Sequence, residues 1–294
     1  MSTSITAHEI ASQPDVWARA LREAPDAADV FGRPGETVLI LGCGTSAFVA
    51  ESIAVLRERA GLGRTDAAYA SEWQPGRRYD RVLVISRSGT TTEVLAALDL
   101  VEPGTTTVAI TGVAGSPIAA AVDQVLLLDW ADERSVVQTR FPTTVLVLAR
   151  AAFGEDLSGL VDEVRAALAA PLPVGAEGVD HVVYLGHGWT YGLAQEAALK
   201  VREAAQAWSE SYPAFDYRHG PIAVAHPGTL VTVLGPTDPA LVADVEGTGA
   251  AVQTTAHDPL VQLVQAQRFA VALAELRGLT PDTPRHLTRS VVLG

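Results

Sequence analysis

Three observations predict an α/β fold with two tandem, doubly wound parallel sheets. Short apolar runs recur along the chain, and each is followed by a segment with a helical pattern. The runs are continuous rather than alternating, which is typical of parallel strands covered by helices on both faces. The pattern restarts after residues 171–175, where two prolines and a glycine indicate a linker. We therefore expect two domains: residues 1–170 with an N-terminal helix, and residues 171–294 with a C-terminal tail.

The first domain is predicted to open with a helix, because Pro14 fits the first turn of a helix that runs to about Arg22. Apolar runs then alternate with helix-compatible segments. The predicted strands cover residues 37–41, 67–70, 81–85, 105–110 and 124–128; one helix reaches about residue 60, and residues 141–170 are helical with a break near Gly154.

The second domain is predicted to repeat this order. Leu41-Gly-Cys-Gly and Leu185-Gly-His-Gly occupy equivalent places after a strand, which indicates a tandem duplication of one α/β unit. The predicted strands cover residues 181–185, 229–234 and 250–254, and the predicted helices cover residues 190–209, 239–246 and 259–277.

The composition limits the classes of partner. The net charge of −13 and the isoelectric point of about 4.9 argue against nucleic acid and anionic membranes, but leave a phosphorylated substrate open. Cys43 is the only cysteine, so we expect no intrachain disulfide and a small core residue at that position. The first nine residues do not resemble a signal peptide, and no apolar run reaches about 18 residues, so we expect a cytoplasmic protein.

The segment 86–92 predicts a phosphate site. It follows an apolar strand and precedes a helix, and six of its seven residues are Ser, Thr or Gly. The N–H groups of a helix start attract anions, and Arg87 adds a full charge. Hydroxyl donors would come from Ser86, Ser88, Thr90 and Thr91. The alternative is plain helix capping, for which one hydroxyl is enough.

The loop after the first strand carries a second pattern, Gly42-Cys43-Gly44-Thr45-Ser46-Ala47. It fits the dinucleotide signature G-x-G-x-x-A, but this motif is weak alone, and Glu72 lies late for a ribose contact. A dinucleotide fold also has no need of the hydroxyls at 86–92. We therefore expect no cofactor, and we expect Thr45 and Ser46 to donate to the same phosphate or to a sugar hydroxyl.

Titratable residues of the second domain form a further candidate group. Glu196, Lys200 and Glu203 are spaced to share one helix face, although spacing alone favours a solvated row of salt bridges. Lys200 is placed to hold Glu203 ionised. His219 lies in a loop of polar and aromatic residues and suits proton transfer near neutral pH; the alternative is an ordinary surface histidine. The histidines show no i, i+4 pairing, so we expect no metal site.

Ordered motifs along the chain identify a resemblance to a known family. They are Glu9-Ile10 and Gln13-Pro14, Cys43-Gly44-Thr45-Ser46, Ser71-Glu72-Trp73, Ser86-Arg87-Ser88-Gly89-Thr90-Thr91, Val136-Val137-Gln138-Thr139-Arg140-Phe141, Ala198-Leu199-Lys200-Val201-Arg202-Glu203, Arg218-His219-Gly220-Pro221 and Pro284-Arg285-His286-Leu287-Thr288-Arg289-Ser290-Val291. On these residues the chain resembles the sugar isomerase (SIS) domain family. More narrowly, it is similar to the isomerase half of glucosamine-6-phosphate synthase and to stand-alone phosphosugar isomerases and deaminases. The resemblance covers nearly the whole chain and implies two SIS domains, each with a flavodoxin-like sheet.

The resemblance implies roles for individual residues. Glu203 is implied to move a proton between C1 and C2 of the sugar, with Lys200 beside it. His219 is implied to assist ring opening from the partner subunit, so a homodimer is expected. Val136 is implied to contact the sugar through backbone groups and Gln138 through its amide.

Two departures from the resembling enzymes shape the expected reaction. Arg289 stands where ammonia-transferring members carry a lysine that forms a Schiff base, and arginine cannot form one. Arg87 stands where the synthase has glutamine, which strengthens or moves the phosphate site. No segment resembles a glutaminase. We expect isomerisation of, or ammonia removal from, a hexose or hexosamine 6-phosphate through an enediol or enolamine, with deaglycation as a close variant. The alternative is a non-catalytic phosphosugar sensor.

Overall fold

The computed structural model describes residues 4–293 and divides the chain into two compact units. Asp15–Ser158 and the C-terminal residues from Thr288 contain a five-stranded sheet, and we call them the five-stranded unit. Gly159–Leu287 and the N-terminal residues up to Pro14 contain a four-stranded sheet, and we call them the four-stranded unit. The expected domains, residues 1–170 and 171–294, stay a prediction. Two parallel sheets with helices confirm the α/β class.

The five-stranded sheet has the order β2-β1-β3-β4-β5, and every neighbouring pair is parallel. The chain leaves β1 toward one edge of the sheet and leaves β3 toward the other. The loops after these two strands therefore diverge at the carboxyl edge, where doubly wound sheets bind their ligands. The strands are β1 (Val38–Gly42), β2 (Thr65–Tyr69), β3 (Arg81–Ile85), β4 (Thr106–Thr111) and β5 (Gln124–Leu127).

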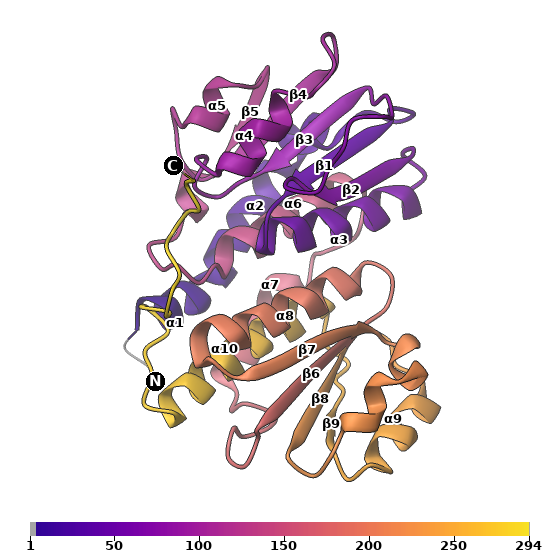
Figure 1. Cartoon of the computed structure of the whole chain (residues 1–294), viewed down its shortest axis with the longest axis vertical. Helices are drawn as coiled ribbons and strands as arrows, with labels where there is room; N and C mark the ends of the chain where they lie inside the picture. The colour runs from indigo at the N-terminus through magenta and orange to yellow at the C-terminus, as the bar shows by residue number, and fades with distance from the viewer. Residues whose placement is uncertain (1–3, 294) are drawn as a thin grey trace. The chain divides into compact units, whose positions relative to one another are not determined.

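Helices cover both faces of this sheet, with α4 and α5 on one face and α3 and α6 on the other (Figure 1). Every residue of β1 and β3 is buried, which confirms that continuous apolar runs mark strands covered on both faces. The helices are α2 (Gln13–Ala27), α3 (Thr45–Arg59), α4 (Thr92–Leu98), α5 (Pro117–Ala120) and α6 (Arg140–Ala152), with short 3₁₀ turns at Ala28–Phe31 and Asp129–Ala131.

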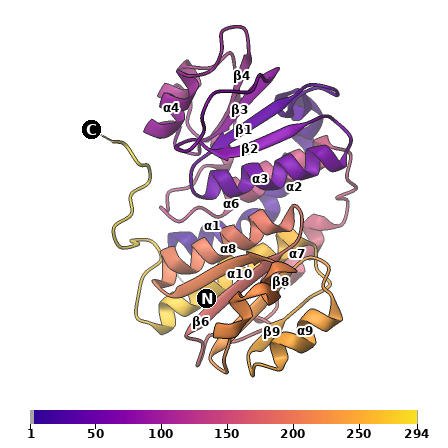
Figure 2. The same ribbon diagram turned by 45° about the vertical axis from the view of Figure 1, so that its right-hand side comes forward.

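The four-stranded sheet has the order β7-β6-β8-β9 and is also parallel throughout. Helices α8 and α10 pack against each other beside this sheet (Figure 2). The strands are β6 (His181–Gly186), β7 (Trp208–Pro213), β8 (Thr229–Leu234) and β9 (Ala251–Gln253). The helices are α1 (Ile5–Ala11), α7 (Leu160–Ala169), α8 (Thr190–Ala205), α9 (Pro239–Glu246) and α10 (Pro259–Leu276), with 3₁₀ turns at Asp216–His219 and Pro221–Val224. Within residues 4–293, no helix is long and apolar enough to cross a membrane.

The predicted helix over residues 190–209 was too long. Helix α8 ends at Ala205 because Gln206 adopts a left-handed conformation with φ of 48°, and the chain then enters β7. Strand β7 was missed because its sequence, Trp-Ser-Glu-Ser-Tyr-Pro, has none of the continuous apolar character of the other strands. It lies at the edge of the sheet, where most of its residues keep some exposure, and this explains its polar composition.

Candidate functional site

The loop between β3 and α4 places its hydroxyls at the carboxyl edge of the five-stranded sheet. Ser86 Oγ accepts a hydrogen bond from the Gly89 N–H at 3.2 Å and lies 3.2 Å from Thr91 Oγ1. Thr91 is the N-cap residue of α4, yet its side chain makes no capping hydrogen bond. The hydroxyl cluster is therefore not explained by helix capping, which favours the phosphate interpretation of this loop over its alternative.

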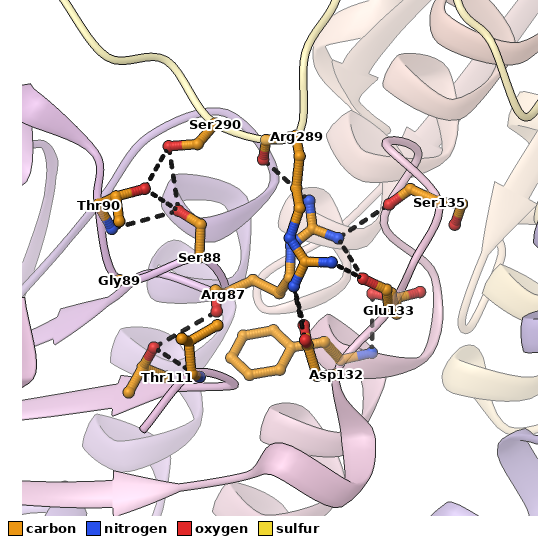
Figure 3. A network of polar contacts seen from close by, with 12 residues as sticks. Arg87, Ser88, Gly89, Thr90, Thr111, Asp132, Glu133, Ser135, Arg289 and Ser290 are labelled. Atoms are coloured by element: carbon orange, nitrogen blue, oxygen red, sulfur yellow. Dashed lines mark hydrogen bonds and ion pairs between the residues drawn. The ribbon is translucent and has the colours of Figure 1, made fainter. Parts of the chain in front are cut away.

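Two further hydroxyls of this loop contact the C-terminal tail within the same unit. Thr90 Oγ1 donates to Ser88 Oγ at 3.2 Å, and Ser88 Oγ donates to Ser290 Oγ at 3.2 Å. Ser290 Oγ lies 2.7 Å from Thr90 Oγ1 (Figure 3). The tail residues 288–293, which we call the strap, continue along α4, where the Leu293 N–H donates to Thr92 Oγ1 at 3.0 Å.

Arg87 directs its guanidinium toward backbone carbonyl groups. The residue is 2% exposed, and its Nη1 donates to the Ser135 carbonyl at 2.9 Å and to the Glu133 carbonyl at 3.3 Å. Its Nη2 donates to the Arg289 carbonyl at 3.0 Å. These contacts join three segments that are distant in the sequence. The role of Arg87 as a phosphate ligand stays a prediction.

Arg289 forms an ion pair with a residue of the same unit. Its Nη2 lies 2.7 and 2.5 Å from the two carboxylate oxygens of Asp132, and its Nη1 donates to the Glu133 carbonyl (Figure 3). The two terminal nitrogens of one guanidinium thus bind two different acceptors, a carboxylate and a backbone carbonyl. The strap is therefore anchored to the segment that precedes α6.

The side chain of Glu133 accepts hydrogen bonds from the backbone of the segment that is predicted to contact the substrate. It is 1% exposed, and its Oε1 accepts from the N–H groups of Thr139 and Arg140 at 2.5 and 2.8 Å. A carboxylate at the start of α6 satisfies N–H groups that have no partner within the helix. The buried Glu133 side chain thus holds the backbone of residues 139–141.

Gln138 and Val136, predicted to line the sugar, belong to this segment and are partly buried. The Oε1 atom of Gln138 is buried and has no hydrogen-bond partner among the described residues. The predicted contact between the Gln138 amide and a ligand stays a prediction.

The loop between β1 and α3 brings its backbone close to the helix. A Cβ atom added to Gly42 would lie 2.5 Å from the Ser46 carbonyl carbon, so only glycine fits here. Thr45 and Ser46 are buried in the first turn of α3, at 4% and 5% exposure. Burial is the main cause that raises the pKa of Cys43, with Glu93 adding to it, so the neutral thiol is favoured. The expected core role of Cys43 fits this inert form.

A buried ion triad lies on α8 in the four-stranded unit. Lys200 Nζ is 3.2 Å from Glu196 Oε1 and 2.6 Å from Glu203 Oε2, and the lysine side chain is 1% exposed. The prediction that these three residues share one helix face is confirmed. The alternative, a solvated row of salt bridges, is wrong because the lysine is buried. Burial alone lowers the pKa of Lys200, yet the charges of Glu196 and Glu203 outweigh it and raise that pKa. The lysine therefore stays a cation.

His219 occupies the last position of the 3₁₀ turn Asp216–His219 and is exposed. Its neighbour Arg218 pairs with Asp238 and Asp244 at 3.2 Å each, which ties the turn to the α9 region. The structure thus leaves His219 at the surface of the four-stranded unit, and its role in proton transfer stays a prediction. Within residues 4–293, no three His, Cys, Asp or Glu side chains are grouped to hold a metal ion.

Sequence reasoning missed Asp132 and did not assign a role to Ser290. Both act through partners that lie more than 150 positions away in the sequence. The nearest signal was Arg289 in the tail motif, because a cation that cannot form a Schiff base needs another partner. Nothing local to Asp132 distinguishes it from the surface carboxylates of the chain.

We expect Gly89→Ala to disturb the β3–α4 loop strongly. Gly89 has φ of +67°, and a Cβ there would lie 2.1 Å from Ser116 Oγ. Overpacking and backbone strain together predict a loss of about 2–4 kcal/mol in the free energy of unfolding. Gly115→Ala is the matched control, because Gly115 has φ of +65° but nothing within 4 Å of an added Cβ. The control should lose only about 1 kcal/mol in urea unfolding; equal losses would mean that the contact with Ser116 is unimportant.

Comparison with known proteins tests the resemblance. Residues 33–153 match the family model described as SIS domain, and the resemblance predicted from the sequence is thereby confirmed. The matched range contains the β1–α3 loop, the β3–α4 loop and the segment before α6.

Among individual relatives, the chain is 29% identical to a glutamine–fructose-6-phosphate aminotransferase (isomerizing) of Bradyrhizobium diazoefficiens, over 88% of this chain and 52% of the relative. The chain thus spans about half the length of the curated relatives it matches. A crystal structure of glucosamine-6-phosphate deaminase from Thermotoga maritima superimposes with a TM-score of 0.87 at 29% identity, covering 99% of this chain and 100% of that one. Tagatose-6-phosphate ketose/aldose isomerase from Escherichia coli shares the fold, with a TM-score of 0.78 at 24% identity over 96% and 95% of the two chains.

Proposed function

We propose that this chain is an enzyme that moves a proton between C1 and C2 of a hexose or hexosamine 6-phosphate. The reaction is an aldose–ketose isomerisation, or its variant in which ammonia leaves an amino sugar phosphate. The observation that carries the proposal is the triad on α8. A carboxylate, Glu203, contacts a buried ammonium and is itself 16% exposed, whereas Glu196 on the other side is 2% exposed. Glu203 is the carboxylate of the pair that a ligand can reach.

The proposed chemistry follows from what a carboxylate beside a fixed cation does. Glu203 takes the proton from one of the two carbons, which leaves an enediol or enolamine, and returns it to the other carbon. Lys200 remains protonated and holds Glu203 in position. His219 assists ring opening, and we propose that it comes from a second copy of the chain in a homodimer.

Phosphate binding is assigned to the five-stranded unit. Ser86, Ser88 and Thr91 supply hydroxyls from the β3–α4 loop, and Thr45 and Ser46 supply donors from the β1–α3 loop. Both loops lie at the carboxyl edge beside the β1–β3 pair, where a doubly wound sheet binds ligands. We propose that the Gln138 amide makes a polar contact to the sugar.

The tail arginine favours isomerisation or deamination over amide-nitrogen transfer. A Schiff base requires a neutral amine, and a guanidinium does not lose its proton in proteins. In addition, Arg289 is engaged with Asp132 and the Glu133 carbonyl. The names of the similar proteins, a deaminase and an isomerising aminotransferase, support a sugar phosphate as the substrate class.

Proton exchange tests the proposal directly. The protein is incubated in D₂O with a panel of hexose, hexosamine and fructosamine 6-phosphates, and NMR follows deuterium at C1 and C2. We expect deuterium uptake with at least one sugar, together with product. Absence of exchange with every sugar that demonstrably binds would contradict the enzyme and favour a phosphosugar sensor.

A further inference from the structure

The three hydroxyls of Ser88, Thr90 and Ser290 form a closed ring of hydrogen bonds. A hydroxyl has a single hydrogen to donate and two lone pairs to accept with. Thr90 Oγ1 gives its hydrogen to Ser88 Oγ at 3.2 Å, and Ser88 Oγ gives its hydrogen to Ser290 Oγ at 3.2 Å. Since both loop hydrogens are used, Ser290 must donate in the short 2.7 Å contact with Thr90 Oγ1.

This ring matters because a phosphate oxygen only accepts hydrogen bonds from a hydroxyl. With the ring closed, each of its hydroxyls points its hydrogen at a neighbour and presents only lone pairs to an anion. Ser88 or Thr90 can donate to a phosphate only when one contact of the ring is broken. The contact between Ser88 and Ser290 of the strap can be lost without changing the contact between Ser88 and Thr90 inside the β3–α4 loop.

Other contacts hold Ser290 in this position. The preceding residue, Arg289, pairs with both oxygens of Asp132 and offers its carbonyl to the buried Arg87. On the other side, the Leu293 N–H donates to Thr92 Oγ1 at 3.0 Å (Figure 3 shows the Arg289 and Ser290 contacts). The strap is thus fixed on both sides of the serine.

We propose that Ser290 determines the affinity of the phosphate loop by competing, within the chain, for the hydroxyl hydrogen of Ser88. The inference rests on the proposed function of that loop and adds the residue that opposes ligand binding. A phosphorylated ligand must displace Ser290, and the Arg289–Asp132 ion pair raises the cost of doing so.

Binding of inorganic phosphate and of glucosamine 6-phosphate, measured by titration calorimetry on the full chain, tests this. Removing one competing hydrogen bond predicts that Ser290→Ala binds both probes about threefold to tenfold more tightly than the wild type. Ser290→Thr keeps the hydroxyl and should restore wild-type affinity. Val292→Ala is the matched control in the strap, because Val292 is 67% exposed, and it should leave affinity unchanged.

A second variant tests the proposal without a substitution at position 290, where Ser290→Ala could cause local misfolding. Asp132→Asn weakens the anchor of the strap without touching the ring, and it should also tighten binding. Unchanged or weaker binding in Ser290→Ala and Asp132→Asn, with clear binding by the wild type, would overturn the competition while leaving the proposed function intact. If the wild type and all variants fail to bind either probe, the phosphate loop itself is wrongly assigned, and the proposed competition by Ser290 is then also wrong.

Discussion

Glu203→Gln is expected to lower turnover by about a hundredfold to ten-thousandfold, the usual contribution of a positioned general base. Glutamine keeps the size of the side chain and can still contact Lys200, but its amide cannot take a proton from carbon. Binding of the sugar phosphate should persist, because the hydroxyls assigned to the phosphate lie in the five-stranded unit. Initial rates and calorimetric binding on the same sample separate the two effects.

Glu196→Gln is the matched control for this experiment. It removes the other carboxylate beside Lys200, on the same helix, while Glu203 keeps its negative charge. A large loss of turnover in Glu203→Gln with a small loss in Glu196→Gln would assign the base. Wild-type turnover in Glu203→Gln would show that another group moves the proton, and equal losses would show that the ion triad rather than the carboxylate is what matters.

The second large effect concerns stability. Lys200→Met is expected to lower the free energy of unfolding by about 3–5 kcal/mol, because it leaves two carboxylates close together without their cation. Glu196 is 2% exposed, so water does not replace the lost partner. Urea unfolding followed by circular dichroism measures the loss.

The pKa of Lys200 also predicts the pH dependence of this contribution. Burial lowers this pKa, but the two glutamates raise it overall, so the folded protein holds the proton more tightly than the unfolded chain does. The stabilisation is therefore complete below the ordinary lysine pKa of about 10.4 and is lost as the pH rises through the higher folded value. The difference between wild type and Lys200→Met should be constant near neutral pH and should shrink only in strong alkali.

Arg165→Met is the control for a salt bridge in the same unit. Arg165 lies 3.5 Å from Asp162, with side chains 52% and 88% exposed, and such surface pairs contribute at most about 1 kcal/mol. A loss in Lys200→Met no greater than in this control would contradict the stabilising role of the buried triad.

Local sequence patterns determined the strands, the two loops at their ends and the shared helix face. Buried parallel strands need apolar side chains on both faces, so β1 and β3 stand out as continuous runs. The helical repeat brings Glu196 and Glu203 to the two sides of Lys200 whatever packs against α8. Strand β7 escaped prediction because an edge strand tolerates polar residues, and its pattern then resembles a helix end.

The tertiary structure alone decided the partners of Arg87, Arg289 and Ser290. The sequence placed Arg87 in a phosphate-site motif, where an anion is the natural partner, and it placed Arg289 and Ser290 in the tail motif. In the folded chain, the arginines meet backbone carbonyls and Asp132, and the serine closes a ring with Ser88. Helix and strand patterns depend on neighbours within a few positions. The partner of a long or tail side chain depends instead on which distant backbone and carboxylate groups the fold brings within about 3 Å, the reach of a hydrogen bond.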